Sequence, residues 1–348
     1  MKKILLIGPI NKGNVPYTGD SAKNQFFYMR FREVFDKVLI VDTWAWTKRP
    51  WVLIDLLLKL IFRRGYKVVI SANPGSADKI IRIAKLLGHT ANIYYWVIGG
   101  SLHKTFENGL LDCTKYRDIA GVLVEGTTMV ESMKKLGLTN VSFVPNFKKI
   151  EYIPRKRQNH DDKMHFVFLS RVDRAKGCDY ILEAIDILNA KGLTNDFDVT
   201  FYGKSTEDKE WLDLFANTVS EIPNAEYKGL LDLRQMSNYD VLAGYDVMLF
   251  PTYWDGEGFP GVIIDAYMAS LPVIASDWNL NKDLVHEGKT GWIIPVHNIS
   301  ALADKMEYVI KHPLEVNEYS LNCGAQAFEY DYRNVLSEEN LRILKVLD

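Results

Sequence analysis

Short apolar runs alternate with helical stretches along the whole of this 348-residue chain, and the alternation falls into two blocks. The first block predicts strands at residues 3–8, 37–42, 67–71, 92–98 and 121–125, with helices between them at 20–35, 50–62 and 76–87. The second block predicts strands near 165–170, 198–202, 246–250, 273–276 and 292–294. Because strands that alternate with helices form parallel sheets, we expect an α/β protein with two Rossmann-like domains.

The length of the chain agrees with two domains at roughly 150 residues each. An apolar content of 47% and a charged content of 25% are typical of a globular protein with an ample core. The three cysteines are scattered and lack metal-ligand spacing, which favours a reducing cytoplasm over a disulfide framework or a zinc site. The opening MKKILLIGPI reads as a first buried strand, because its apolar run is too short for a signal peptide.

A polar, charged stretch without apolar periodicity separates the two blocks at residues 148–163. We interpret it as a linker between an N-terminal domain, residues 1–147, and a C-terminal domain, residues 164–330. The remaining segment, residues 331–348, contains the helical sequence EENLRILKVL.

The sequence EGFPGVIIDAYMASLPVIASD, from Glu257 to Asp277, places an acid on a Gly/Pro-rich loop before a short apolar helix. Pro260 and Gly261 mark the helix start, where unpaired N–H groups form a ready anion site. Glu257 and Asp265 are eight residues apart and can flank such an anion. This layout suits a polyhydroxylated phosphate ester, while the alternative is an ordinary loop-to-helix turn.

A second motif, HFVFLSRVDRAKGCDYILEAIDILNAKG, reads as a strand, a basic loop and an amphipathic helix that ends at Gly192. Arg171 and Lys176 fall on the loop between strand and helix, where open α/β sheets bind ligands. An arginine can fork two phosphate oxygens, and a lysine supplies a point charge. The alternative is a pair of solvated loop charges.

Together, RVDRAKG and EGFPGVIIDAYMASLPVIASD resemble the donor-site signatures of the retaining glycosyltransferases of family 4. Weaker similarity in VSFVPNFKK, DVMLFPTYWDGEGFP and HEGKTGWIIP extends the resemblance over most of the chain. The resemblance implies a GT-B fold, in which two Rossmann-like parallel-sheet domains face each other across a cleft. It also implies that the C-terminal helix crosses back to the first domain.

The resemblance further implies a role for each motif residue. Arg171 and Lys176 would meet the charge that develops on a leaving diphosphate, and Glu257 would hold the hydroxyls of the donor sugar. His103 would touch the donor sugar or the acceptor. The residues implied in donor binding are Gly19, Gly258, Phe259, Pro260, Gly261 and Asp265.

The chain departs from the family pattern at several of these places. Asp265 stands where the family normally has a glutamate for the ribose hydroxyls, and Asn279-Leu280 replaces a usual Gly-Gly. Only Gly19 remains of a Gly-Gly loop after the first strand. His103 comes a few positions after the usual histidine, so an ordinary surface histidine is the alternative.

The expected reaction transfers a sugar, with retention, from a UDP- or GDP-sugar to a hydroxyl of a glycan or of a lipid-diphosphate-linked saccharide. We expect no metal and no further cofactor, because two basic side chains and a helix start can carry the leaving diphosphate. The expected pathway is bacterial capsule, exopolysaccharide or lipopolysaccharide synthesis. The alternatives are a sugar-nucleotide epimerase or sugar phosphorylase of the same fold, or a non-catalytic sugar-nucleotide-binding assembly subunit.

The net charge of −2 conceals a strong asymmetry between the two halves. Residues 1–157 carry 26 Lys and Arg against 12 Asp and Glu, whereas residues 158–348 carry 16 against 32. A basic first half suits an anionic acceptor or an anionic membrane surface. We do not expect a nucleic-acid partner, because no nucleic-acid-binding motif accompanies the charge.

The apolar stretch from Trp51 to Phe62 bears on the membrane hypothesis. Its 12 residues make about 18 Å of helix, which is too short to cross a bilayer. An apolar surface on nearly all sides predicts either a buried helix or a helix partly embedded in the membrane interface. In the second case the protein would be peripheral on the inner face of the cytoplasmic membrane.

Overall fold

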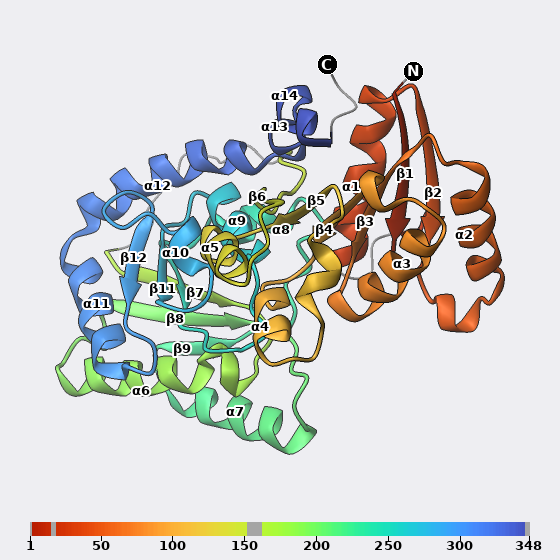
Figure 1. Cartoon of the computed structure of the whole chain (residues 1–348). Helices are drawn as coiled ribbons and strands as arrows, with labels where there is room; N and C mark the ends of the chain where they lie inside the picture. The colour runs from red at the N-terminus through yellow and green to blue at the C-terminus, as the bar shows by residue number, and fades with distance from the viewer. Residues whose placement is uncertain (1, 15–18, 152–161, 345–348) are drawn as a thin grey trace. The chain divides into compact units, whose positions relative to one another are not determined.

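The computed structural model describes residues 2–14, 19–151 and 162–344. The chain forms two compact units: unit 1 comprises Met1–Lys149 with Tyr330–Asp348, and unit 2 comprises Ile150–Glu329. Each unit has a six-stranded sheet in which every strand pair is parallel, flanked by helices (Figure 1). The predicted α/β fold with two parallel-sheet domains is therefore confirmed.

The sheet of unit 1 has the strand order β2-β1-β3-β4-β5-β6. Its four inner strands, β1, β3, β4 and β5, are rich in Val, Ile and Tyr and almost wholly buried, as expected for a parallel sheet covered on both faces, whereas the edge strands β2 and β6 are partly exposed. The bounds are β1 Lys3–Gly8, β2 Lys37–Asp42, β3 Lys67–Ala72, β4 Ile93–Val97, β5 Gly121–Val124 and β6 Val141–Phe143. The sequence pattern missed β6, because three residues are too few to show a period.

The helices of unit 1 come from both ends of the chain. They are α1 Gly19–Val34, α2 Trp51–Phe62, α3 Pro74–Leu86, α4 Leu102–Glu107, α5 Thr127–Lys135, α13 Tyr332–Val335 and α14 Glu338–Leu341. The C-terminal segment returns to unit 1: Tyr332, Leu336 and Leu344 belong to its core. Arg30 of α1 also donates a hydrogen bond to the Leu336 carbonyl at 2.9 Å. Where one C-terminal helix was expected, the described residues form α14 and a single 3₁₀ turn, Arg342–Leu344.

The sheet of unit 2 has the strand order β12-β11-β10-β7-β8-β9. Its strands are β7 Met164–Leu169, β8 Phe197–Tyr202, β9 Ala225–Tyr227, β10 Val247–Phe250, β11 Val273–Ser276 and β12 Gly291–Ile294. Its helices are α6 Cys178–Ala190, α7 Lys209–Glu221, α8 Asn238–Leu242, α9 Gly261–Met268, α10 Asn281–Leu284, α11 Ile299–Lys311 and α12 Pro313–Ala327. The three-residue strand β9 was also missed.

The segment predicted as a linker, residues 148–163, contains 152–161, which lie outside the described residues. At its start, Lys148 bridges to Asp331, so the chain leaves unit 1 and re-enters it at neighbouring positions. Lys148 N–H donates to the Tyr330 carbonyl at 3.0 Å, and Tyr332 N–H donates to the Lys148 carbonyl at 2.8 Å.

The apolar helix α2 packs beside β2, but it is not buried on all sides (Figure 1). Val52, Leu56 and Leu60 are buried, whereas Trp51 and Phe62 are 62% and 68% exposed. The interpretation of this helix as a fully buried one is therefore wrong. Within the described part of the chain, no helix combines the length and the apolar character that crossing a membrane requires.

Candidate functional site

The strand order of unit 2 locates its ligand-binding edge. The chain leaves β7 toward β8 on one side of the sheet, and β10 continues on the other side, so the direction of winding reverses between β7 and β10. Ligands of open α/β sheets bind at the carboxyl ends of the strands at such a reversal. Lys176 follows β7 and Glu257 follows β10, so both lie on loops at this point.

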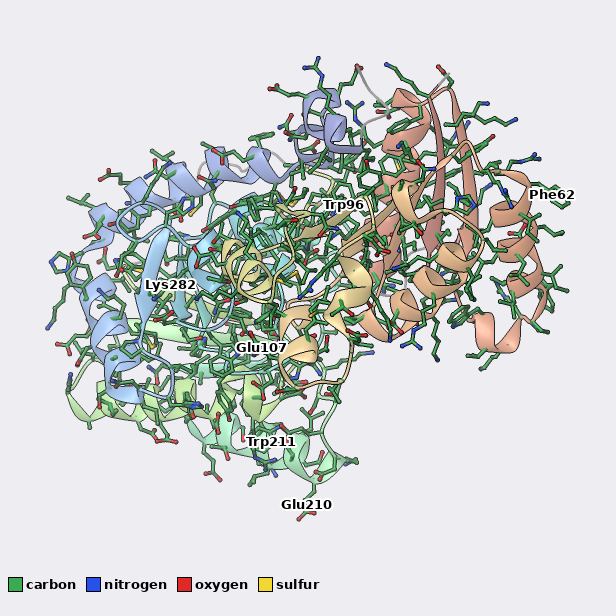
Figure 2. All side chains as sticks on the ribbon, viewed as in Figure 1. Phe62, Trp96, Glu107, Glu210, Trp211 and Lys282 are labelled. Atoms are coloured by element: carbon green, nitrogen blue, oxygen red, sulfur yellow. The ribbon has the colours of Figure 1, made fainter. Side chains whose placement is uncertain are left out.

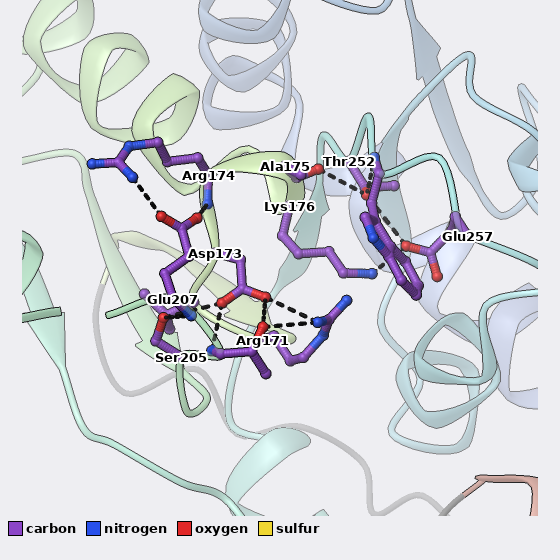
Figure 3. Close-up of polar contacts among 12 residues, drawn as sticks. Arg171, Asp173, Arg174, Ala175, Lys176, Ser205, Glu207, Thr252 and Glu257 are labelled. Carbon is purple, nitrogen blue, oxygen red and sulfur yellow. Dashed lines mark hydrogen bonds and ion pairs between the residues drawn. The ribbon is translucent and has the colours of Figure 1, made fainter. Parts of the chain in front are cut away.

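Lys176 and Glu257 form an ion pair between the two loops, and their side chains point toward one another (Figure 3). Lys176 is 4% exposed and Glu257 is 8% exposed. Burial lowers the pKa of Lys176 from its ordinary value, and the nearby Glu257 carboxylate opposes that shift. The pair therefore places one cation and one anion, both poorly hydrated, at the switch point of the sheet.

The loop from β7 to α6 depends on Gly177 to present Lys176. Gly177 has φ +79°, which side-chain-bearing residues rarely adopt, and an added Cβ would lie 2.4 Å from the Pro251 carbonyl oxygen. A glycine at this point lets the loop pass directly against the end of β10. This close approach brings Lys176 within reach of the Glu257 loop.

Arg171 is the second cation of this loop, and it reaches the same place through an aromatic ring. Its guanidinium lies 4.4 Å from the centroid of the Trp254 ring, and Lys176 Nζ lies at the same distance from that centroid. The indole is thus in contact with both cations. Arg171 also lies 3.1 Å from Asp173 Oδ2 and donates to Thr206 Oγ1 at 3.0 Å (Figure 3).

Asp173 holds the β7 loop against the loop that follows β8. It accepts hydrogen bonds from the Thr206 N–H and hydroxyl, each at 2.7 Å, and from the Ser205 hydroxyl at 3.0 Å. Burial acts to raise the pKa of Asp173, but these hydrogen bonds and Arg171 bring it below its ordinary value. Asp173 therefore stays ionised and fixes the loop that carries both cations.

The Glu257 loop is held by Thr252, which sequence reasoning missed, and by Asn279, which it noted only as a departure from the family pattern. Thr252 Oγ1 donates to Glu257 Oε2 at 3.2 Å, and Asn279 Nδ2 donates to the Glu257 carbonyl at 3.0 Å. Asn279 has φ +46°, a left-handed conformation that glycine and asparagine tolerate best. The asparagine therefore combines a left-handed backbone with a hydrogen bond to the acidic loop.

The predicted donor-binding segment Gly258–Gly261 leads directly into α9. Pro260 is the residue before the helix, and Gly261 is its first residue. Phe259 and Pro260 are buried, whereas Gly258 and Gly261 are partly accessible. The start of α9, at Gly261, therefore lies four residues after Glu257. The first N–H groups of a helix have no partner within the helix, which makes this end favourable for an anion.

Asp265 lies inside α9 and is 6% exposed. Its Oδ1 accepts a hydrogen bond from the Tyr239 hydroxyl of α8 at 2.5 Å. Burial raises the pKa of Tyr239, so this hydroxyl remains a donor. Sequence reasoning missed Tyr239, which gives the shorter acid at this position a partner within the protein.

Gly19 and His103 lie in unit 1. Gly19 is the first residue of α1, after β1, and the preceding residues 15–18 lie outside the described residues. His103 is on α4, after β4, and its Nδ1 is buried without a hydrogen-bond partner in the described part of the chain. Burial lowers the pKa of His103, so the neutral imidazole is favoured.

Unit 1 carries a buried ion pair of its own that the sequence did not reveal. Lys23 on α1 pairs with Glu125, which follows β5, and these residues are 4% and 3% exposed. The next residue, Asn24, donates hydrogen bonds to the Pro9 and Ser71 carbonyls at 3.2 and 3.1 Å. These contacts tie the start of α1 to the carboxyl ends of β1, β3 and β5.

The fold and this arrangement of cations, acid and helix start agree with a family model. Residues 149–329 match the model of the glycosyl transferases group 1, which covers just over half of the chain. This chain belongs to the glycosyl transferases group 1. The matched region coincides closely with unit 2, which contains Arg171, Lys176 and Glu257.

Named relatives of this group 1 glycosyl transferase are distant. The poly(ribitol-phosphate) alpha-N-acetylglucosaminyltransferase of Staphylococcus aureus is 23% identical over 293 residues, which are 81% of this chain and 56% of that protein. The putative colanic acid biosynthesis glycosyltransferase WcaL of Salmonella typhimurium is 24% identical over 153 residues, which are 41% of this chain and 35% of that protein. The chain therefore spans about half the length of these relatives, or less.

A solved structure matches over the full length. Anabaena Alr3699/HepE, crystallised in complex with UDP, superimposes on this chain with a TM-score of 0.70 at 14% sequence identity. The match covers 99% of this chain and 99% of that protein. At this identity the likeness shows the fold alone. With the two parallel sheets, it supports the two-domain GT-B architecture.

Proposed function

We propose that this protein is a retaining glycosyltransferase that moves a sugar from a nucleotide-diphosphate sugar to a hydroxyl of a glycan or lipid-linked saccharide. The observation that carries the proposal is the buried Lys176–Glu257 pair at the switch point of unit 2, with Arg171 beside it. A cation and an acid held together in this way suit the two ends of a sugar diphosphate.

In the proposed reaction the bond between the anomeric carbon and the β-phosphate oxygen breaks, and its electron pair leaves with the nucleoside diphosphate. Lys176, Arg171 and the backbone N–H groups of Gly258 and Gly261 stabilise that developing charge. The acceptor oxygen bonds to the same face of the anomeric carbon, and its proton passes to the leaving phosphate. On this route no side-chain base and no metal are required, and metal independence is part of the proposal.

The two acidic residues bind the hydroxyl groups of the donor through hydrogen bonds. Glu257 would accept hydrogen bonds from the sugar, with its loop fixed by Thr252 and Asn279. Asp265 would accept hydrogen bonds from the ribose hydroxyls, either directly or through the Tyr239 hydroxyl, which already donates to Asp265. UDP is the first nucleotide to test, because the Anabaena neighbour is described in complex with UDP.

The proposed pathway is the synthesis of a bacterial surface polysaccharide on the cytoplasmic side of the membrane. The proposal is supported by two relatives, one named as a poly(ribitol-phosphate) glycosyltransferase and the other as a putative colanic acid biosynthesis glycosyltransferase. The proposed acceptor is a glycan or a lipid-diphosphate-linked saccharide, and the basic balance of the first 157 residues suits such an anionic molecule.

The test is a panel of UDP- and GDP-sugars, titrated with and without a chelator and then assayed for transfer to acceptor hydroxyls. We expect binding of at least one sugar nucleotide that the chelator does not change, and turnover that requires an acceptor. Lys176→Ala and Glu257→Gln should each lower turnover about a hundredfold or more. Lys191→Ala, which removes an exposed lysine of the same unit, is the matched control and should leave turnover unchanged.

The other outcomes are distinct. Interconversion of sugar nucleotides without an acceptor would indicate an epimerase, and release of a sugar phosphate would indicate a phosphorylase. Donor binding without any turnover would favour a non-catalytic assembly subunit. Binding that disappears with the chelator would contradict the metal-independent mechanism.

A further inference from the structure

Helix α2 of unit 1 presents a continuous apolar stripe to solvent. Its buried residues are four apart, at Val52, Leu56 and Leu60. The exposed stripe consists of Trp51 (62% exposed), Ile54 (60%), Leu58 (50%), Ile61 (42%) and Phe62 (68%). The spacing of the stripe, three or four residues from Trp51 to Ile61, places it along one side of the helix.

This stripe lies opposite the buried face. At 3.6 residues per turn, Ile54 and Leu58 point away from the side on which Val52 and Leu56 pack. Figure 2 shows Phe62 on the outward side of the helix. Single exposed apolar residues, such as Leu86 on α3, are ordinary, but a contiguous apolar patch on a protein surface marks an interaction site.

The helix is held firmly, so the stripe is a fixed surface. Lys59 Nζ donates to the Ile40 carbonyl of β2 at 2.7 Å and pairs with Asp55 at 2.6 Å. The ring Nε2 of buried His89 lies 2.6 Å from the Leu60 carbonyl near the helix end.

Basic residues flank the stripe at both ends. Lys48 and Arg49 precede α2, Arg63 and Arg64 follow it, and all four are exposed. Asp55 is the single acid between residues 48 and 64, and it is paired with Lys59. Apolar side chains with aromatic residues at the ends and cations on either side match a bilayer surface, where acyl chains lie below anionic headgroups.

We propose that α2 is a membrane-docking helix, which lies in the plane of an anionic bilayer with Trp51, Ile54, Leu58, Ile61 and Phe62 in the lipid interface. Lys48, Arg49, Arg63 and Arg64 contact the headgroups. The inference concerns unit 1 alone and does not require the sugar transfer proposed above. If both are correct, the surface would hold the enzyme at the membrane, where a lipid-linked acceptor is found.

The test is flotation of the full chain with vesicles of phosphatidylcholine alone or with phosphatidylglycerol added. We expect binding to the anionic vesicles that weakens at high salt. Ile54→Gln/Leu58→Gln should reduce the apparent partition coefficient at least about tenfold, because two apolar side chains no longer enter the interface. Arg63→Gln/Arg64→Gln should reduce it by about tenfold or more on anionic vesicles.

The matched control is Leu86→Gln, which removes an exposed leucine from another helix of unit 1 and should leave vesicle binding unchanged. All variants should retain sugar-nucleotide binding and turnover of a water-soluble acceptor, which separates this proposal from the catalytic one. Failure of the wild-type chain to bind anionic vesicles would overturn the proposal. So would concentration-dependent self-association that Ile54→Gln/Leu58→Gln abolishes, because the stripe would then be an interface between copies of this chain.

Discussion

Lys176 and Glu257 pair with one another across 81 residues of chain, and both are almost completely buried. Removing two charges from water is expensive, and their attraction often only balances that penalty. A buried ion pair is therefore weak evidence for stability. Its place at the switch point of unit 2 gives it a functional explanation instead, because two poorly hydrated charges interact strongly with a bound anion and with hydroxyls.

This explanation predicts that stability and activity respond differently to the same substitutions. Lys176→Ala or Glu257→Ala leaves one buried charge without its partner, so each should lower the free energy of unfolding by about 3–5 kcal/mol. The double variant Lys176→Met/Glu257→Leu should be at least about 2 kcal/mol more stable than either single variant, because both charges are gone. Urea unfolding measures this difference.

Transfer assays on the same proteins complete the test. The double variant should remain inactive although its stability recovers, since the groups proposed to contact the donor are absent. Recovery of turnover together with stability would show that the pair has a structural role only.

Gly177 and Gly192 provide a matched pair for the loop that carries Lys176. Both have a positive φ, +79° at Gly177 and +85° at Gly192. A Cβ added at Gly177 would collide with Pro251, whereas a Cβ added at Gly192 would have none of the described atoms within 4 Å. Gly192→Ala should therefore lower the free energy of unfolding by about 1–2 kcal/mol through backbone strain. Gly177→Ala should lower it by about a further 1–3 kcal/mol and reduce turnover, because the loop must move away from β10. Equal effects in urea unfolding would contradict this account.

Asn279 combines a left-handed backbone with a hydrogen bond to the Glu257 carbonyl, and substitutions separate the two. Asn279→Gly keeps the backbone conformation and loses the hydrogen bond, so unfolding free energy should fall by about 1 kcal/mol. Asn279→Ala loses the hydrogen bond and also disfavours the left-handed backbone, so its free energy of unfolding should be about 1 kcal/mol lower still. Donor titration should show the weakest binding for Asn279→Ala, and tighter binding than wild type in either variant would be inconsistent with support of the acidic loop.

The fold was largely predictable because apolar periodicity reports burial directly. Most strands of both sheets begin and end within a residue or two of the predicted bounds, since each is long enough to show its pattern. The three-residue strands β6 and β9 were missed because pairing with a neighbouring strand, not local sequence, makes them strands. The α2 stripe was ambiguous for a similar reason: an apolar helix does not record which of its sides another element covers.

The site was predictable only where motifs carry it. The loop positions of Arg171, Lys176 and Glu257 follow from strand–loop–helix patterns. Trp254, Tyr239 and the Lys23–Glu125 pair were missed, because each becomes notable only through a partner far away in the chain. Thr252 was missed although its partner Glu257 is only five residues away, because no motif marks a single threonine. Asn279 offered a signal, since asparagine in place of glycine suggests a left-handed backbone.

His103 should make the stability of unit 1 sensitive to pH. Burial lowers its pKa below the ordinary value of 6.5, so as pH falls the unfolded chain takes up a proton before the folded chain does. The folded state is therefore progressively destabilised as pH drops through 6.5, and the loss is complete below the folded-state pKa. As pH rises over the same window, the contribution of neutral His103 to the free energy of unfolding returns, and it is complete above pH 6.5.

Calorimetry of the full chain from pH 8 to pH 5 measures this effect. The melting temperature of wild type should fall more over this range than that of His103→Gln, which cannot be protonated there. At pH 8 the imidazole is neutral in both states, so the difference between the two proteins at that pH gives the packing contribution alone. The difference between the two slopes of melting temperature against pH then gives the effect of protonating His103. Parallel curves would show that His103 is hydrated enough to take up its proton freely in the folded chain.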